Sequence, residues 1–517
     1  MLGTPVEARP RASISVELSP TARVDGPNSV TPHGALLTEM QQRVRSFYDR
    51  LGFERERWIA RNRYYYHALA CLVRSLIAPA QRVLDVGCGN GDLLAAVEPA
   101  HGVGVDLSPA MLDIARRKHP ELELSSQAAE ALALPGYEVR DGVGGFDAVL
   151  MVNVVGELAD VLAAFKRLRP LVRPDTRLVV VYYNHLWEPL IAPAARLGLK
   201  LDNPTQNWLS LDDLRGFLHL AGFEVVKVGA RLPCPKYVPG IAALANRVLG
   251  NLPLLHRLGF VRFLVARPEM PLSAPSSAFS CTVVVPCKNE EDNVPAIPPR
   301  VPLMGAFTEI VFVDDGSTDA TAERIRAACA MHRDRQIRLV TGPGQGKGAA
   351  VRAGLEQARG DVLMILDADM AVMPEDLPAF FAAITENKGE FVNGTRLVYP
   401  LSGRAMRTAN IVGNKLFAML FTFILGQRIT DTLCGTKAIL RRDYAKILAA
   451  RAEFGDVDRW GDYDWIFGAA KHNLKIVELP IHYVERIAGT SKMTKRLQNA
   501  SIMLRMCWVA FRKLRMA

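Results

Sequence analysis

The sequence predicts two consecutive α/β domains, each built around a largely parallel sheet. At 517 residues the chain is too long for one hydrophobic core and suggests two or three domains. In both halves, short apolar runs such as 83–86 and 362–366 alternate with helical patterns and end in glycines or carboxylates. Residues 268–280 are rich in proline and serine and lack periodicity, so we expect a linker between the domains there.

These features divide the chain into five expected segments. They are a disordered arm over 1–35, a first domain over 36–267, the linker over 268–280, a second domain over 281–495 and a basic amphipathic tail over 496–517. The arm is rich in Pro, Ser, Thr and Ala and lacks the apolar core of a signal peptide.

Composition narrows the class of protein. About half of the residues (49%) are hydrophobic and the net charge is +10, which is typical of a globular chain with a basic surface. The eight cysteines include no C-x-x-C pair, which argues against a zinc site or a disulfide framework and fits a reducing, cytoplasmic compartment. No run approaches the roughly 20 apolar residues needed to cross a bilayer.

The first domain carries a glycine-rich turn at a strand end. The strand over 83–86 contains Asp85 and runs into Gly87, Gly89 and Gly91. Glycines at this turn let the backbone approach a ligand at the sheet edge. The next strand ends in Asp106, where a carboxylate can accept hydrogen bonds from both hydroxyls of a ribose.

Four motifs in this order resemble the class I S-adenosylmethionine-dependent methyltransferases, which have a Rossmann-like fold. The motifs are L-D-V-G-C-G-N-G, G-V-D-L-S-P-A-M-L, A-A-E-A-L-A-L-P and F-D-A-V-L-M-V-N. The resemblance implies an S-adenosylmethionine site made by Asp85, Gly87, Gly89, Gly91, Asp106, Leu107, Ala129 and Glu130. Ala128 stands where the family commonly has Asp, which leaves adenine recognition open. A Rossmann-like domain that has lost its cofactor is the alternative.

The methyl acceptor is not indicated by the sequence. Tyr183, Asn184 and His185 follow the expected fifth strand, at the edge where a base can be placed. His185 is our candidate general base for methyl transfer.

In the second domain, three strand ends carry acids. The first of these strands ends at Pro286 and is followed by Glu290. Asp314 and Asp315 end the second strand, and Asp367 and Asp369 end the third. Residues two apart on an extended strand point the same way, so we expect Asp367 and Asp369 to face one Mg²⁺ or Mn²⁺ ion. Such an edge suits a nucleotide-diphosphate sugar with its metal.

The second half resembles the family-2 glycosyltransferases of the GT-A fold, and within them the polyprenyl-phosphate sugar synthases. The motifs are V-P-C-K-N-E, V-D-D-G-S-T-D, G-K-G-A-A-V-R-A-G, L-D-A-D-M, N-G-T-R, D-T-L-C-G-T-K-A and R-I-A-G-T-S-K-M. By position, the resemblance implies a UDP- or GDP-sugar pocket made by Pro286, Asn289, Glu290, Asp314, Asp315, Lys347 and Asp367, with Asp367 and Asp369 serving the metal. Cys287 stands where relatives often have an aromatic residue, which leaves the base open.

The acceptor side of this domain offers two alternatives. Asp462 and Asp464 fall where relatives carry an acid facing the acceptor, and one of them would act as base toward an alcohol in an inverting displacement. A phosphate acceptor is already anionic and needs no base; Arg486 and Lys492 would then hold it.

The tail combines apolar residues with Lys and Arg, and the run over 416–426 is apolar with Lys415 beside it; neither contains an acid. Such helices suit the surface of an anionic bilayer, and a buried core helix is the alternative for each. Nucleic acid is not expected as a partner, because the basic residues do not alternate with aromatic stacking platforms.

The sequence therefore predicts a bifunctional, membrane-associated enzyme of the cell envelope. A glycosyltransferase would move a sugar to a polyprenyl phosphate or related lipid at the cytoplasmic face of the membrane, and a methyltransferase would modify a sugar or lipid intermediate. The alternatives are a glycosyltransferase that extends a polysaccharide with Asp464 as base, and a first domain that is only a scaffold.

Overall fold

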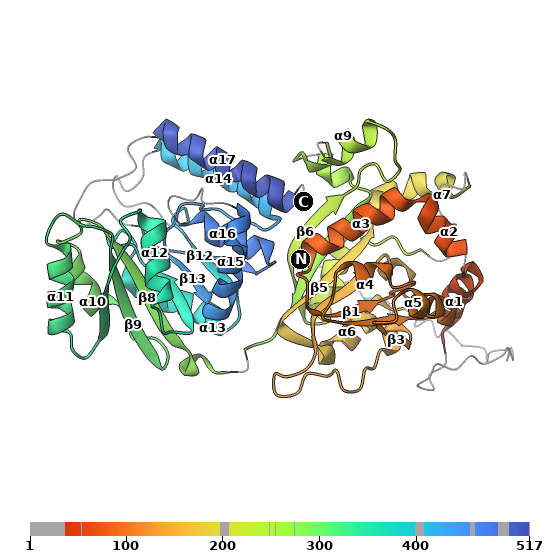
Figure 1. The fold of residues 1–517 in the computed structure, drawn as a ribbon, viewed down its shortest axis with the longest axis horizontal. Coiled ribbons are helices and arrows are strands. Elements are labelled where there is room, and N and C mark those ends of the chain that lie inside the picture. The colour runs from red at the N-terminus through yellow and green to blue at the C-terminus, as the bar shows by residue number, and fades with distance from the viewer. Residues whose placement is uncertain are drawn as a thin grey trace, which may run out of the picture.

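The computed structural model describes residues 37–52, 54–196, 206–247, 249–253, 255–272, 274–398, 408–454, 461–483 and 496–515. Two α/β domains lie side by side, with the chain crossing from one to the other near residue 270 (Figure 1). The expected arm over 1–35 lies outside the described residues, as do Arg486 and Lys492.

The N-terminal domain is built on a seven-stranded sheet with the order β3-β2-β1-β4-β5-β7-β6. The first five of these strands are mutually parallel, and β7 runs antiparallel to both of its neighbours. The strands are β1 Arg82–Val86, β2 His101–Asp106, β3 Glu123–Ser126, β4 Phe146–Val152, β5 Val172–Tyr183, β6 Phe223–Arg231 and β7 Val261–Pro268.

Helices cover both faces of this sheet, because its central strands are apolar on both sides. Helices α3 and α4 pack on one face, whereas α6 and α8 pack on the other. The helices are α1 Glu39–Leu51, α2 Glu54–Arg61, α3 Arg63–Leu76, α4 Asp92–Ala96, α5 Pro109–Lys118, α6 Val161–Leu168, α7 Glu188–Arg196, α8 Leu211–Leu220 and α9 Ile241–Arg247.

The C-terminal domain has a second seven-stranded sheet, with the order β10-β9-β8-β11-β13-β12-β14. Strands β10, β9, β8 and β11 are parallel, and β13 is antiparallel to β11 and β12. The strands are β8 Ser280–Cys287, β9 Phe307–Asp314, β10 Gln336–Thr341, β11 Val362–Ile365, β12 Phe391–Thr395, β13 Lys437–Leu440 and β14 Ile476–Pro480.

Two groups of helices enclose the second sheet. Helices α10, α11 and α13 bury apolar side chains on one face, and α12 and α14–α17 do so on the other. The helices are α10 Ile297–Arg300, α11 Thr321–Met331, α12 Lys347–Glu356, α13 Leu377–Thr385, α14 Thr408–Leu425, α15 Arg441–Phe454, α16 Tyr463–Lys471 and α17 Arg496–Arg515. None of the helices within the described ranges has both the length and the apolar character required to cross a bilayer.

The expected tail forms α17 and shares the core of the second domain. Met503, Met506 and Ala510 are buried against α14 and its neighbours. Leu504 and Trp508, on the opposite face, are exposed. One face of α17 therefore packs in the core, as the alternative interpretation of the tail predicted, and the other face is open to solvent.

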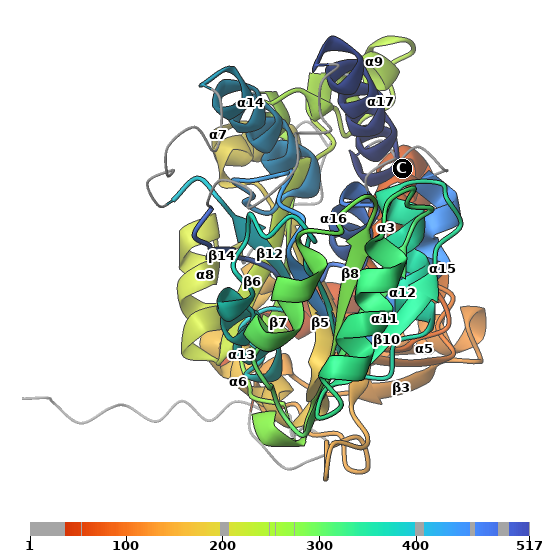
Figure 2. The same ribbon diagram turned by 90° about the vertical axis from the view of Figure 1, so that its left-hand side faces the viewer.

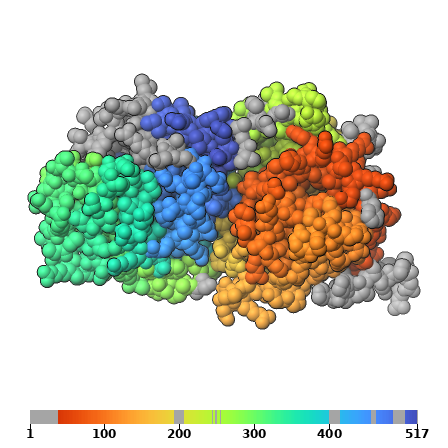
Figure 3. All heavy atoms as spheres, in the orientation of Figure 1, coloured from red at the N-terminus to blue at the C-terminus, as the bar shows by residue number. Residues whose placement is uncertain are grey.

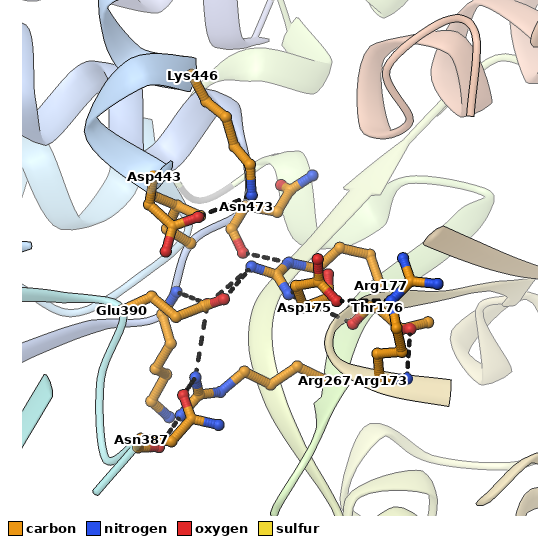
Figure 4. Close-up of polar contacts among 12 residues, drawn as sticks. Arg173, Asp175, Thr176, Arg177, Arg267, Asn387, Glu390, Asp443, Lys446 and Asn473 are labelled. Carbon is orange, nitrogen blue, oxygen red and sulfur yellow. Dashed lines mark hydrogen bonds and ion pairs between the residues drawn. The ribbon is translucent and has the colours of Figure 1, made fainter. Parts of the chain in front are cut away.

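The two domains share a buried network of charged groups, which Figure 4 shows. Glu390, just before β12, accepts two hydrogen bonds of 2.7 Å from the Arg177 guanidinium on β5. Arg267 at the end of β7 lies 3.6 Å from the same carboxylate and donates to the side chain and the carbonyl of Asn387. Burial opposes ionisation of Glu390, but the two arginines outweigh it and hold the pKa of this carboxyl below its usual range.

A second set of contacts extends this interface. Asn473, between α16 and β14, accepts from Lys227 at 3.2 Å and donates to the Leu76 carbonyl at 2.9 Å. The Arg177 Nε donates to the Asn473 carbonyl at 2.9 Å. The linker thus joins two domains that also bind each other directly through buried polar contacts.

We expect Glu390→Ala to destabilise the protein by about 3–5 kcal/mol, because it leaves the buried Arg177 and Arg267 without their shared carboxylate. Urea unfolding measures this change. Glu375→Ala is the matched control, since Glu375 pairs with Arg300 at the surface and its loss should cost about 1 kcal/mol or less. Equal, small effects of both substitutions would contradict the role given to the interface.

Candidate functional site

The predicted glycine turn lies at the carboxyl end of β1. Gly87 and Gly89 have φ angles of 82° and 55°, in the left-handed region that favours glycine. A Cβ on Gly87 would lie 2.7 Å from the Val154 side chain, whereas a Cβ on Gly89 would meet nothing within 4 Å. The Gly89 amide donates to Asp106 at 2.8 Å, which ties the turn to the end of β2. The turn therefore borders open space at the sheet edge.

That space is a cavity of about 240 Å³ above the ends of β1, β2 and β4. Six of the eight residues predicted to hold S-adenosylmethionine line it: Gly87, Gly89, Asp106, Leu107, Ala129 and Glu130. Gly91 is absent from the lining; it is the N-cap residue of α4, and a Cβ there would meet His119 and Leu122.

Asp85 lies behind the turn and is buried. Its Oδ1 atom has no hydrogen-bond partner among the described residues. Burial, together with the nearby Asp106, raises the pKa of Asp85 to about 7. An unpaired buried carboxyl beside a glycine turn is suited to a cationic group brought by a ligand.

Helices α1 and α2 add a wall to the cavity that our sequence analysis missed. Tyr48 on α1 and Arg55 and Trp58 on α2 all line the cavity. The Tyr48 hydroxyl donates at 2.8 Å to Glu157, which lies in the turn after β4 and also lines the cavity. Burial, and then the Glu157 carboxylate, raise the pKa of Tyr48 well above its usual value. In a sequence, aromatic residues at helical spacing look the same whether they line a cavity or pack in a core, so the pattern did not indicate this wall.

The predicted base His185 is not among the residues that line this cavity. It lies in a 3-10 turn over His185–Trp187, and its Nδ1 atom has no partner among the described residues. Tyr183, two residues earlier, lines the cavity instead. The two side chains differ because β5 ends at Tyr183, so His185 follows in a turn and is not placed by the strand.

In the second domain, Asp315 organises the glycine-rich loop. Its two carboxylate oxygens accept hydrogen bonds from the amides of Gly344 and Gly346, at 2.7 and 2.8 Å. Asp314 accepts from the Ser317 amide at 3.1 Å. The loop leads directly into α12, which begins at Lys347.

Before this loop, the segment after β8 is also fixed at the same edge. Asn289 has a φ angle of 54° and accepts from the Thr318 amide at 2.8 Å. The Glu290 amide donates to the Thr321 hydroxyl at 2.8 Å. Pro286 lies in β8 and pairs with Val313 of β9. The structure thus brings these predicted nucleotide-site residues to the edge that carries Asp314 and Lys347.

Lys347 is the centre of a charged cluster. Its ammonium lies 2.8 Å from Asp367 and 3.9 Å from Asp462, and Lys437 lies 3.3 Å from Asp462. Burial opposes the charge of Lys347, but Asp367 and Asp462 raise its pKa above the usual value. For Asp367, Lys347 outweighs burial and lowers the pKa. Asp462 therefore belongs to the same cluster as the predicted metal ligand Asp367.

Asp367 and Asp369 do not lie on an extended strand, which was the premise for predicting that they face the same way. Strand β11 ends at Ile365, and Asp369 lies in the turn that follows. The chain leaves the sheet there because the antiparallel neighbour β13 begins at Lys437, opposite Ile365. Strand alternation therefore does not set the direction of the two carboxylates.

We tested whether these residues fit a divalent ion. No group of three or more His, Cys, Asp or Glu side chains suited to a metal occurs in the part of the chain that the structure describes. Magnesium commonly takes one or two protein carboxylates and completes its shell with substrate phosphates and water. Asp367 and Asp369 fit this donor set, with Lys347 already beside Asp367.

Asp464 lies apart from this cluster. Its carboxylate is 2.9 Å from Arg451 and 3.6 Å from Arg352. These two arginines neutralise it, and neither belongs to the group around Lys347. Of the two candidate bases, Asp462 is the one that shares Lys347 with Asp367.

A further ion pair borders the same edge and was missed in our sequence analysis. Arg396, after β12, makes hydrogen bonds of 2.6 and 2.7 Å to Asp431, which is fully buried. Asn414 on α14 donates to the same carboxylate at 2.8 Å. Arg396 belongs to the motif N-G-T-R and Asp431 to D-T-L-C-G-T-K-A. The motifs therefore indicated both segments, but not that these two side chains pair. Helix α14 is thereby connected to the site.

Family models match both halves of the chain. Residues 282–448 match glycosyl transferase family 2, and residues 36–228 match a methyltransferase domain. A SAM-dependent methyltransferase from Thermotoga maritima, described as a possible histamine N-methyltransferase, superposes with a TM-score of 0.35 at 20% identity, covering 44% of this chain and all of that one.

Two relatives resemble the second half. A dolichyl-phosphate beta-glucosyltransferase of Trichomonas vaginalis is 32% identical over 263 residues, or 46% of this chain and 75% of that protein. An undecaprenyl-phosphate 4-deoxy-4-formamido-L-arabinose transferase of Aeromonas hydrophila is 36% identical over 215 residues, or 41% of this chain and 62% of that protein. The predicted families and the two-domain fold class are confirmed. The chain belongs to glycosyl transferase family 2 and joins its glycosyltransferase domain to an N-terminal methyltransferase domain.

Proposed function

We propose that the second domain transfers a sugar from a UDP- or GDP-sugar to a polyprenyl phosphate or related lipid. The cluster of Lys347, Asp367 and Asp462 at the carboxyl edge of the sheet carries this proposal. Ligands of open α/β sheets bind at this edge, and Lys347 at the start of α12 offers a cation to a diphosphate. The relatives named above act on dolichyl and undecaprenyl phosphates, which supports the same acceptor class here.

A divalent ion would be held by Asp367 and Asp369 together with the donor diphosphate. When bound, it would offset the negative charge that develops on the leaving group. Lys347 and Lys437 place positive charge beside the same position, and Lys347 lowers the pKa of Asp367. A phosphate acceptor is already a nucleophile, so Asp462 is not required to remove a proton. The alternative with Asp464 as base has less support, because Arg352 and Arg451 occupy its carboxylate.

The first domain is proposed to use S-adenosylmethionine as methyl donor. Gly87 and Gly89 would admit the methionine portion, and Asp106 would accept from the ribose hydroxyls. The unpaired Asp85 oxygen would meet the ammonium group, directly or through the turn. Tyr48 and Glu157 stand on the opposite wall, where an acceptor would enter.

Membrane contact is proposed for the outer faces of α14 and α17. Leu416 and Met419 on α14, and Leu504 and Trp508 on α17, are all exposed. Helix α14 holds Asp431 through Asn414, and Asp431 holds Arg396 at the site edge. A bilayer at these helices would therefore present a lipid acceptor close to the donor site. The location would be the cytoplasmic face of the membrane.

We expect Asp369→Asn to abolish sugar transfer, because the amide removes a charge facing a cation, at a cost of several kcal/mol in the transition state. Release of nucleoside diphosphate, with and without EDTA, measures the activity. Methyl transfer should survive, since it uses another sheet. Asp106→Ala is the reciprocal variant: it should weaken S-adenosylmethionine binding in calorimetry and leave sugar transfer intact. Full activity of Asp369→Asn in EDTA would remove the metal from the mechanism.

The raised pKa of Asp85 predicts a pH dependence of stability. The folded protein keeps this carboxyl protonated up to about pH 7, whereas the unfolded chain releases the proton near pH 4. The resulting stabilisation is full below about pH 4 and is lost as pH rises through about 7. Between pH 5.0 and 7.5, Asp85 should cost about 3 kcal/mol of unfolding free energy.

Urea unfolding of the ligand-free protein at these two pH values tests this dependence. Asp85→Asn should remove about 3 kcal/mol from the difference between the two pH values. Asp334→Asn, at an exposed position, should leave the difference unchanged. An unaltered pH dependence in Asp85→Asn would show that Asp85 ionises freely in the folded protein.

A further inference from the structure

The methyltransferase domain has an insertion between β6 and β7, over 232–260, that presents apolar side chains to solvent. Ile241 and Leu244 on α9 are 63% and 55% exposed. Tyr237, Leu252, Leu255 and Leu258 in the same insertion are exposed as well. Single exposed apolar residues are ordinary, but a contiguous group marks an interaction surface.

This insertion adjoins the exposed faces of α14 and α17. In both views α9, α14 and α17 lie together along the upper side of the molecule (Figures 1 and 2). The ring of His256 in the insertion is 5.3 Å from that of Phe423 on α14. Figure 3 shows α17, in dark blue, and the segment around α9, in light green, on the same side. We call the exposed apolar residues of 232–258, α14 and α17 the upper face.

Other exposed large apolar side chains of the described residues come mostly from separate parts of the fold. They include Val143, Leu220, Leu303, Met331, Val398 and Leu448. The gathering of apolar residues on the upper face is therefore a local property.

The charge of the upper face indicates its partner. Residues 232–258, α14 and α17 together contain nine Lys and Arg and no Asp or Glu. Lys415, Arg257, Arg505 and Arg512 are exposed among the apolar side chains. A protein surface of this length rarely lacks acids altogether, and the mixture of Trp, Leu and basic residues matches the headgroup region of an anionic bilayer.

Basic groups also lie beneath the face, at the seam between the domains. Lys227 on β6 and Arg515 on α17 are both buried there. Burial, and then Arg515 and Arg231, lower the pKa of Lys227 to about 7, so this lysine is only partly charged at neutral pH. An anion bound at the surface above the seam would favour its charged form.

The insertion is connected to the methyltransferase cavity. The Asn184 side chain, at the end of β5, donates to the carbonyls of Arg257 and Gly259 at 2.9 and 2.8 Å. Phe260 packs against Tyr183, with ring centroids 5.3 Å apart, and Tyr183 lines the cavity. The insertion therefore contacts residues at the edge of the sheet that borders the cavity, and a lipid headgroup bound to the insertion would lie near that edge.

We propose that 232–258 binds the same anionic bilayer as α14 and α17, so that the methyltransferase domain works on an acceptor borne by that membrane. This inference rests on the proposed function for the membrane contact of α14 and α17. The buried contacts of Glu390 and Asn473 hold the two domains together, which keeps both parts of the upper face in one orientation. Both domains would then act on lipid-linked substrates in the same leaflet of the membrane.

The test is binding of the full chain to vesicles of phosphatidylglycerol and phosphatidylcholine, measured by co-sedimentation. Ile241→Asp/Leu244→Asp should weaken binding at least tenfold, and Leu416→Asp/Leu504→Asp should do the same. Val143→Asp/Leu220→Asp, at exposed apolar sites elsewhere, is the matched control and should bind as the unaltered protein does. Ile241→Ser/Leu244→Ser repeats the test with a smaller change, and urea unfolding checks that each variant is folded.

The outcomes separate this inference from the proposed function. If only Leu416→Asp/Leu504→Asp loses binding, the insertion does not contact the membrane and the inference is overturned alone. If neither variant loses binding, the membrane contact in the proposed function also fails. Light scattering without vesicles identifies the rival occupant: a dimer that Ile241→Asp/Leu244→Asp dissociates would assign the face to a second copy of the chain. Equal binding to pure phosphatidylcholine would overturn the role of charge.

Discussion

The buried carboxylate of Glu390, held between Arg177 and Arg267, is the constraint on which the arrangement of the whole chain depends. Glu390 and Arg267 are 3% and 1% exposed. Arg267 also pairs with Glu224 of its own domain, so Glu390 and Arg177 are the two groups that would lose their ion pair if the domains separated. Both arginines come from the strands β5 and β7 of one sheet, and the carboxylate precedes β12 of the other. Such a pair contributes little net energy compared with apolar packing, but its geometry admits one relative orientation. The orientation is what places the two catalytic edges and the upper face in fixed relation.

Much of the fold was predictable from sequence because local patterns determined it. The strands β1, β8, β9 and β11 occur where apolar runs end in glycines or acids, and β7 and β8 bound the predicted linker within one residue at each end. The interface was not predictable. Arg177, Arg267 and Glu390 lie inside or beside ordinary strand patterns, and nothing local distinguishes a charge that will pair across domains from one that will face water. Their partners are more than 100 residues away in the chain.

In the two sites as well, features set by local sequence were predictable and features set by distant residues were not. The residues named by motif reach the expected edges, since a motif records backbone geometry: Gly87 and Gly89 require their positive φ angles, and Lys347 begins its helix after a glycine loop. Predictions that relied on side-chain direction fared less well. His185 follows the end of β5 and is not part of the cavity lining, and Asp369 lies in a turn after β11. A strand ends where its neighbouring strand stops pairing with it. That pairing depends on residues far away in the chain, so the local sequence does not show it.

The separation of Asp462 from Asp464 illustrates how the site and the fold depend on each other. The two carboxylates are two residues apart at the start of α16, so helical geometry sends them in different directions. Asp462 meets Lys347 and Lys437, which come from the helix after the glycine loop and from β13; Asp464 meets Arg352 and Arg451 on α12 and α15. Helix α16 is thus fixed by ion pairs on both sides, one facing the donor edge and one facing the helical layer. Asp464 pairs with two arginines, which makes it poorly suited to accept a proton. Asp462 lies near Lys347, so an anion that binds at the donor site and attracts this lysine would also affect Asp462.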